Sequence, residues 1–350
     1  MKRVIKYFRN NLKLLIGIIV GGIIFGSLGV YAATVIAASN VGYSDNASLG
    51  ATNVQDAIDK LNTKATTKIK EAEAKCPKGY DCTKSKLCKR ATTLHTETCS
   101  QTASSNYCSG DGYTASGSMK TTTITYGNLG TTGTLTSGDA FDCDVNGDGV
   151  YDSATERFYY VSDMTNGVTQ DSNTAVLIYY NNVSGGVASN STVYDYDSNR
   201  DAHTNGPITA KGQLPTTSQW KNVSLINATR DITDEENTVR KSAFSYEGYA
   251  ARLLTYQEVY NGCYDGTTSI TSTKGLSSKC KYLMENTKYS SNGLATLGGW
   301  LESPMGSNSR RAWIAHAVYR SVDGNYVDYA NIIPNGVRPA IEVLKSNISY

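Results

Sequence analysis

The chain has 350 residues, enough for one large or two modest domains, and 39% of them are hydrophobic, which suffices for a core. Only 18% are charged, and tyrosine occurs 25 times against 5 for phenylalanine, a balance typical of a strand-rich surface protein. The net charge of +2 argues against a nucleic-acid partner, because phosphate binding requires clustered Lys and Arg.

The N-terminal residues predict a membrane anchor. Residues 1–13 contain five basic residues and no acid, which predicts a cytoplasmic tail. Residues 14–38 carry no charge and are long enough to cross the ~30 Å hydrocarbon layer of a membrane. We therefore expect a single-pass protein of the cell membrane with everything after residue 38 outside the cell. The alternative is a cleaved signal peptide, because residues 30–32 offer a small-residue cleavage site.

Residues 39–75 predict a polar linker followed by a stalk helix. Thr52 and Gln55 form a capping-box pattern, and apolar residues then recur at steps of three and four from Val54 to Ala72. We expect this apolar stripe to pack on the body of the protein. The alternative is self-association through the same stripe.

Eight cysteines, all after residue 75, predict up to four disulfides in an oxidising compartment. Residues 76–112 are rich in Cys and Lys and poor in apolar residues, so we expect a module that depends on disulfides for its order. One pairing is favoured by the spacing: Cys263 with Cys280, because the other six cysteines lie far away in the sequence.

Strands are predicted throughout residues 113–350, where β-branched and aromatic runs such as "TTTITYG", "RFYYVSDM" and "TAVLIYYNNV" alternate with Gly, Asn and Asp clusters. Two helices are predicted within the same region. "TTSQWKNVSLIN" (216–227) begins at a threonine cap, and "TYQEVYNGC" (255–263) begins with Thr255 and Glu258 in a capping-box pattern. The expected fold class is α+β, with short antiparallel strands and two helices.

The segment "DCDVNGDGVYD" predicts a calcium loop of EF-hand type. Its candidate ligands alternate along the chain: Asp144, Asn146, Asp148, the carbonyl group of Val150, and Asp152. The twelfth position is Thr155 instead of the usual bidentate Glu, and Glu156 lies one residue late. A Ca²⁺ ion here is expected to be structural. The alternative is an acidic turn between two strands.

Three motifs carry a resemblance to a known family. "ARLLTYQEV" (251–259), "GGWLESP" (298–304) and "GVRPAIEV" (336–343) occur in this order. They resemble the landmarks of the formylglycine-generating-enzyme-like branch of the C-type-lectin-like fold, and in particular its bacterial surface domains that end in "WLRSP … GVRPAL". The resemblance covers roughly residues 140–345 and implies a C-type-lectin-like head over residues 113–350.

The resemblance also implies roles for single residues. Arg338 would lie buried in a central final strand against a carboxylate, with Glu258 or Glu302 as its partner, because an unpaired buried guanidinium is costly. Arg252 and Trp300 would likewise hold the fold. The cysteine pair that serves catalysis in that family is missing, because no cysteine follows Cys280, and we therefore expect no enzyme activity.

In ligand-binding members of the same fold, the segment between Trp300 and Gly336 displays the binding face. We expect residues 305–332 to recognise a glycan or a protein through mixed aromatic and polar side chains. The candidate ligand-binding residues are Asn308, Arg310, Arg311, Trp313, His316, Tyr319, Asp323, Asn325, Tyr326 and Asp328. The alternatives are a structural cell-surface subunit that binds neighbouring copies, an enzyme with an unrecognised site, and a strand meander whose alternate residues form core.

Overall fold

The computed structural model describes residues 56, 58–60, 86–101, 106–107, 120–164, 171–189, 192–263, 278–287, 289–290, 298–316, 321–327 and 335–350. The chain divides into two compact units, Met1–Lys75 and Cys76–Tyr350. In the first unit the described residues are helical, and Lys60 pairs with Asp56 one turn earlier at 3.0 Å. The rest of the predicted linker and stalk, residues 39–75, lies outside the described residues.

The prediction of a single-pass membrane protein is not supported and is corrected here. Within the part of the chain that the structure describes, no helix combines the length and the apolar character needed to cross a membrane. The predicted tail (1–13) and anchor (14–38) lie outside the described residues.

The main sheet of the second unit has six strands in the order β17-β7-β6-β5-β1-β18. Their bounds are Ala340–Leu344 for β17, Thr174–Tyr179 for β7, Arg157–Asp163 for β6, Ala140–Cys143 for β5, Cys88–Arg90 for β1 and Ile348–Ser349 for β18. Neighbouring strands are antiparallel except β1 and β18, which are parallel. The strand after Arg338, β17, stands at one end of this order and not at the centre as expected.

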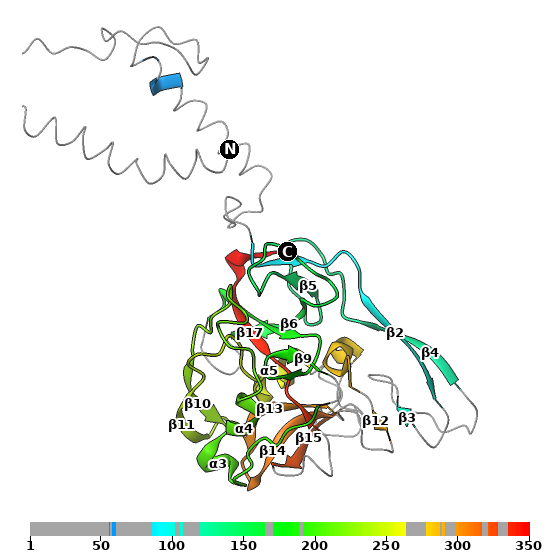
Figure 1. Ribbon diagram of the computed structural model, residues 1–350, viewed down its shortest axis with the longest axis vertical. Coiled ribbons are helices and arrows are strands. Elements are labelled where there is room, and N and C mark those ends of the chain that lie inside the picture. The colour runs from blue at the N-terminus through cyan, green and yellow to red at the C-terminus, as the bar shows by residue number, and fades with distance from the viewer. Residues whose placement is uncertain are drawn as a thin grey trace, which may run out of the picture. The chain divides into compact units, whose positions relative to one another are not determined.

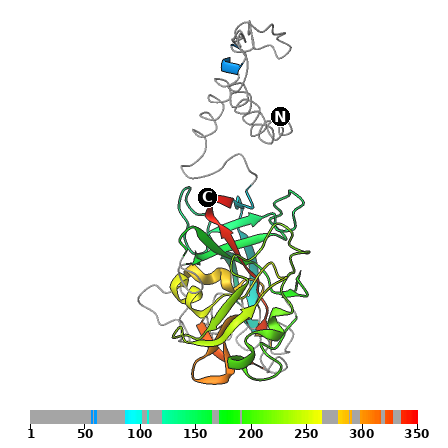
Figure 2. The same ribbon diagram turned by 90° about the vertical axis from the view of Figure 1, so that its left-hand side faces the viewer.

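A second sheet has the order β15-β14-β13-β16, with bounds Ser321–Tyr326, Asn308–His316, Gly298–Met305 and Asn335–Gly336. Four two-stranded ribbons complete the described strands: β2 (His95–Gln101) with β4 (Lys120–Tyr126), β3 (Asn106–Tyr107) with β12 (Tyr289–Ser290), β8 (Val183–Ser184) with β9 (Val187–Ala188), and β10 (Thr229–Thr233) with β11 (Val239–Ser245). Figures 1 and 2 show the β13–β14 hairpin at the end of this unit opposite the C-terminus.

The described residues are therefore mostly β-structure, which corrects the predicted α+β class. Their helices are short: α3 (Ala202–Asn205), α4 (Ile208–Lys211), α5 (Tyr256–Cys263) and the 3₁₀ helices η3 (Ser278–Met284) and η4 (Lys345–Asn347). The start of α5 confirms the predicted capping box. The Thr255 hydroxyl accepts from the Glu258 N–H at 3.1 Å, and the Glu258 carboxylate accepts from the Thr255 N–H at 2.9 Å.

The helix predicted over 216–227 is wrong. The Trp220 N–H donates to the Thr216 carbonyl, but two residues later the Asn222 N–H donates to the carbonyl of Val145 in another segment. The Trp220 ring packs edge-on against Phe158 at 5.6 Å. Ser, Thr and Asn have modest helix propensity, so these tertiary contacts outweigh the local preference.

The six-stranded sheet carries apolar core on both faces. Phe158 and Tyr160 of β6 belong to one core cluster, and Tyr159 and Val161 belong to the other. Successive residues of a strand point to opposite faces, so both faces of β6 are covered. This explains why "RFYYVSDM" and "TAVLIYY" read as continuous apolar runs without alternation.

Two disulfides join described cysteines. Cys263 bonds to Cys280 with the Cα atoms 5.7 Å apart, which is the predicted pairing. Cys88 of β1 bonds to Cys143 of β5, with the Cα atoms 4.0 Å apart. Because β1 pairs with β5 in the main sheet, residues 88–90 belong to the head and not to a separate module over 76–112.

Candidate functional site

The candidate metal centre is the loop of residues 144–156 between β5 and β6. It begins directly after the disulfide-bonded Cys143, and it ends where the Cys143 N–H donates to the carbonyl of Glu156 at 2.9 Å. A disulfide and the sheet therefore fix the two ends of the loop, and neither contact requires a bound ion.

Carboxylate and amide oxygens turn the backbone inward along the first half of this loop. Asp144 accepts from the N–H groups of Gly147 and Gly149 at 2.9 and 3.1 Å, and Asn146 accepts from the Asp148 N–H at 2.8 Å. Gly147 and Gly149 have φ of +81° and +84°, in the left-handed region that glycine adopts without strain. Gly149 thus makes the turn expected at the sixth loop position.

Three carboxylates converge in the loop: Asp144, Asp148 and Glu156 each place one oxygen within 4.8 Å of the other two. Glu156 is buried, and burial raises its pKa, assisted by the negative charges of Asp148 and Asp144 and opposed by N–H groups of Asp152 and Asn146. In the sequence, Glu156 lies one residue after the twelfth loop position, and it is not among the predicted ligands. The structure brings Glu156 into the cluster, so it is a candidate ligand that the sequence analysis missed.

The predicted ligand Asp152 has partners of its own. The Asp152 carboxylate accepts from the Ala154 N–H and the Thr155 hydroxyl at 2.9 and 2.7 Å, and these bonds lower its pKa, the hydroxyl most. It is not part of the three-carboxylate cluster. Val150 is 56% exposed, and its N–H donates to Asp148 at 2.7 Å, so the predicted role of its carbonyl group stays a prediction.

The donor set fits a hard cation. The three carboxylates offer only oxygen, the ligand type that Ca²⁺ and Mg²⁺ take and that Zn²⁺ sites of Cys and His lack. The Asn146 amide faces the Asp148 carboxylate with its nitrogen, which donates at 3.1 Å. The larger Ca²⁺ ion tolerates irregular geometry from flexible loops, whereas Mg²⁺ requires a near-ideal octahedron. The residues present therefore fit Ca²⁺ better.

Neighbouring segments hold the loop from outside. Asn222 Nδ2 donates to the carbonyl and to a carboxylate oxygen of Asp144 at 3.0 and 3.2 Å. The Tyr179 hydroxyl donates to the Thr155 carbonyl at 2.8 Å, and the Tyr151 hydroxyl donates to the Lys86 carbonyl. The loop is thus anchored to three separate parts of the chain.

The predicted recognition residues do not share one face. Adjacent strand residues point to opposite sides, so Arg311 and Trp313 of β14 share a side with Tyr326 of β15, the partner of Arg311. The other side holds the remaining described members: Asn308, Arg310, His316, Asp323 and Asn325. Tyr319 and Asp328 lie outside the described residues. The single face expected over 305–332 is therefore corrected to two faces of a hairpin.

Three of these residues are buried: Trp313 and His316 are each 7% exposed and Asn325 is 4% exposed. Trp313 packs against Tyr256 at 4.8 Å and donates to Glu235, so it braces α5 against the hairpin and is not a surface contact. Burial lowers the pKa of His316 to about 4, against the attraction of Asp323, so His316 is neutral at pH 7. Exposed Asn308, Arg310 and Asp323 and the half-exposed pair Arg311–Tyr326 remain at the surface.

Arg338 is buried, but its partner is not a carboxylate as expected. Its guanidinium donates to three backbone carbonyls, those of Tyr179, Leu283 and Tyr282, at 2.5, 2.7 and 2.7 Å. Two of these carbonyls lie in the last turn of η3, where carbonyl oxygens carry partial negative charge. Burial lowers the pKa of Arg338, opposed by the charge of Glu285.

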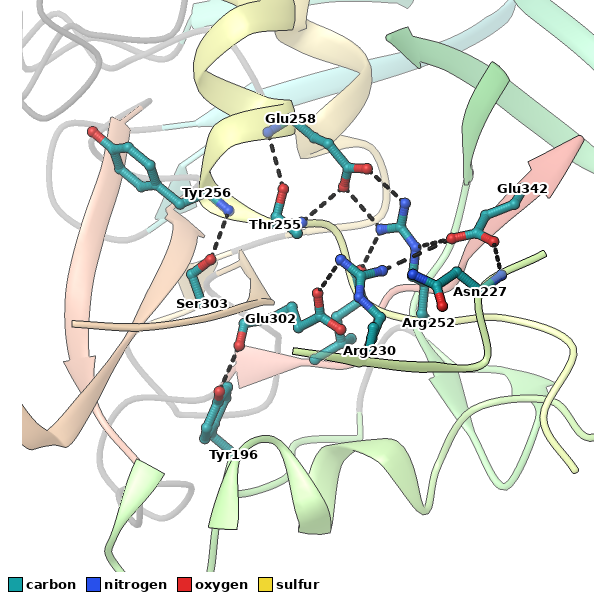
Figure 3. A network of polar contacts seen from close by, with 11 residues as sticks. Tyr196, Asn227, Arg230, Arg252, Thr255, Tyr256, Glu258, Glu302, Ser303 and Glu342 are labelled. Atoms are coloured by element: carbon teal, nitrogen blue, oxygen red, sulfur yellow. Dashed lines mark hydrogen bonds and ion pairs between the residues drawn. The ribbon is translucent and has the colours of Figure 1, made fainter. Parts of the chain in front are cut away.

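The carboxylates predicted for Arg338 belong to other arginines. Glu258 pairs with Arg252, and Glu302 pairs with Arg230 at 2.7 Å. Glu342 also accepts from Arg252, at 2.6 Å, and all five side chains are buried (Figure 3). Arg252 and Glu258 thus lie in a structural network, while Trp300 lies in the core and donates to the Tyr194 carbonyl at 2.7 Å.

A small cavity of about 10 Å³ lies between the sheets, lined by Ile178, Leu254, Leu283, Gly299, Trp300, Leu301, Ala315 and Arg338. Its volume corresponds to about one water molecule, which excludes it as a ligand pocket.

No family model, curated protein or solved structure matches the chain. The resemblance to bacterial surface domains of the formylglycine-generating-enzyme-like branch therefore stays a prediction.

Proposed function

We propose that this chain is a non-catalytic recognition protein whose β-rich head is stabilised by a structural Ca²⁺ ion in the 144–156 loop. The observation that carries this proposal is the convergence of Asp144, Asp148 and Glu156 in a loop whose backbone already turns around Asp144. Three like charges so close repel one another, and a divalent cation removes that repulsion.

The ion would act on the fold through the ends of two strands. Asp144 follows β5, and Glu156 precedes β6, so one ion bound to both would fix the junction of two central strands. Asn222 reaches the same carboxylate of Asp144 from the segment after Trp220, and the ion would hold that segment as well. Ca²⁺ binding is therefore expected to stabilise the whole head and not the loop alone.

The test is Ca²⁺ binding by the purified full chain, measured by calorimetry and by Tb³⁺ luminescence excited through Tyr151 within the loop. We expect a 1:1 site, and Ca²⁺ at a 100-fold excess over Kd should stabilise the protein by about 2.7 kcal/mol. Asp148→Asn should weaken binding strongly. Asp152→Asn is the matched control, because the Asp152 carboxylate is engaged with Ala154 and Thr155, and it should retain the site. Equal unfolding midpoints in Ca²⁺ and in chelator would refute the calcium role.

The recognition part of the proposal rests on the exposed end of the β14–β15 hairpin. The Arg311 guanidinium lies 4.3 Å from the centre of the Tyr326 ring, and this half-exposed pair combines a rigid aromatic surface with hydrogen-bond donors. Such a pair suits a glycan or a protein ligand. The five buried charges of Figure 3 contact one another, which supports a structural role for them.

Binding of the full chain to arrays of glycans and surface proteins tests recognition. The double variant Arg311→Ala/Tyr326→Ala should lose a specific ligand, whereas Arg310→Ala/Asp323→Ala, on the other side of the hairpin, is the matched control. If only the control variant loses ligand binding, the binding site lies on the other face of the hairpin. Self-association without any ligand would favour the alternative of a structural subunit that binds its own copies.

A further inference from the structure

Arg311 of β14 and Tyr326 of β15 are register partners in the hairpin, and the Arg311 guanidinium stacks on the Tyr326 ring. Among the residues that the structure describes, no carboxylate pairs with this guanidinium, and its buried Nε has no hydrogen-bond partner. The partly exposed Arg240, by contrast, pairs with Asp234 at 2.6 Å. A guanidinium has five N–H donors and no acceptor, so Arg311 holds a positive charge and donors that the described chain does not use.

Apolar surface lies on the same side of the hairpin as this charge. Gly324 stands two residues before Tyr326, so both residues face this side of β15. The sulfur of Met305 occupies the space above Gly324, and a Cβ atom added to this glycine would lie 1.9 Å from the sulfur. The glycine therefore lets Met305 lie across β15, and this side combines a cation with an aromatic ring and a thioether.

The outer edge of β15 is closed to a peptide strand. β15 stands at one end of the second sheet, and the Val327 N–H just after it donates to β14. The N–H groups of Tyr326 and Gly324 therefore point away from β14. Each already donates to the preceding side chain, Gly324 to Asp323 at 2.7 Å and Tyr326 to Asn325 at 2.8 Å. A peptide that adds a strand to a sheet edge needs such donors, so this mode of protein recognition is disfavoured here.

We infer that the ligand of the Arg311–Tyr326 surface is an acidic glycan, whose sugar rings carry carboxylate groups. The inference rests on the recognition function proposed above. The planar guanidinium matches a carboxylate in a two-point contact, and a neutral glycan would leave its charge unpaired. The C–H face of a sugar ring is apolar and suits the surface that Tyr326 and Met305 offer, since binding sites combine apolar contact with a few placed polar groups.

The test is calorimetric binding of the full chain to a panel of uronate and sialate oligosaccharides, each measured beside its methyl ester, which keeps the sugar but lacks the charge. We expect at least one acid to bind about tenfold more tightly than its ester, as for one charge-assisted pair. Arg311→Gln should bring this ratio of Kd values to about one. Arg311→Lys keeps the charge but not the planar fork, and should keep only part of the preference. Arg310→Gln, on the other side of the hairpin, is the matched control and should keep all of it.

Equal affinity for every acid and its ester would overturn the acidic class while leaving recognition by this surface intact. A preference that survives in Arg311→Gln would overturn the role of Arg311. Binding of poly-glutamate without binding of any glycan would overturn the glycan and assign the surface to an acidic protein. Absence of every ligand, here and on the arrays, would overturn the recognition function and the inference with it.

Discussion

The guanidinium of Arg252 donates to both carboxylate oxygens of Glu258, from Nη2 to Oε1 at 2.6 Å and from Nη1 to Oε2 at 2.8 Å, and both side chains are fully buried. Such a two-point contact fixes the orientation of both groups. Glu258 also caps α5 by accepting from the Thr255 N–H, and Arg252 forms a β-bridge with Ala340 of β17. The pair therefore ties the start of the helix to this strand (Figure 3).

Glu258→Gln should destabilise the protein by about 3–5 kcal/mol, because it breaks the buried two-point pair and leaves the Arg252 guanidinium with only one of its two charged partners, Glu342. Burial opposes the ionised form of Glu258, but the charge of Arg252 outweighs it and lowers the pKa of Glu258. Urea unfolding measures the loss. The exposed Glu236→Gln is the control and should change stability by less than about 0.5 kcal/mol. Similar small losses in both variants would contradict a strong buried pair.

Glu302 makes the stability of the folded protein fall as pH rises, because its pKa is raised, whereas the pKa of Glu258 is lowered. Three carboxylates face two guanidinium groups, and burial raises the pKa of Glu302 against the attraction of Arg230 and Arg252. A pKa raised in the folded state means stability that is complete below the unfolded value, about 4.3, and that is lost as pH rises through the folded value.

Glu302→Gln should remove this loss, because the amide cannot ionise. We expect the free energy of unfolding of the variant, relative to the unmodified protein, to improve as pH rises from about 4.3 to neutrality. Urea unfolding at a series of pH values measures it. Two stability curves that run parallel over this range would show that Glu302 has an ordinary pKa.

Arg338→Lys should destabilise the protein by roughly 2–4 kcal/mol, because one ammonium group cannot reach all the carbonyls that the planar guanidinium contacts, and buried acceptors are left unpaired. The three carbonyls belong to Tyr179, Tyr282 and Leu283, so the loss should loosen η3 against β7. Hydrogen exchange of these segments and urea unfolding measure it. The exposed Arg310→Lys is the control, and a loss of equal size there would contradict the role of Arg338.

The sequence predicted that Arg338 is buried but not what it contacts. The sequence contains several buried arginines and glutamates, and their charges alone do not show which pairs form. In the structure Glu258 pairs with Arg252 and Glu302 pairs with Arg230. Backbone carbonyls at the end of a 3₁₀ helix carry no residue-type signal, and this partner was therefore missed. The capping box of α5, by contrast, depends on residues three apart, and local spacing predicted it correctly.

The same contrast between local spacing and tertiary contacts decides which parts of the two candidate sites could be predicted. The first half of the candidate calcium loop is defined by local turns, and its residues were predicted, but the position of Glu156 depends on how β6 enters the sheet. The candidate recognition residues were predicted to share one face because residues 305–332 were treated as a single surface. Pairing of Arg311 with Tyr326 sets which residues share a side, and this register is not readable from composition.

Glu156→Gln should have effects of opposite sign with and without Ca²⁺. In chelator, the buried carboxylate faces Asp144 and Asp148, so removing its charge relieves repulsion and should raise the unfolding midpoint. With Ca²⁺ present, the variant lacks one of three carboxylate ligands, binds the ion more weakly, and should fall below the unmodified protein. Thermal unfolding of both proteins in both conditions measures this crossing. A variant that is less stable in both conditions would show that Glu156 serves the fold through its N–H contacts with Asn146 and Asp152 and not through an ion.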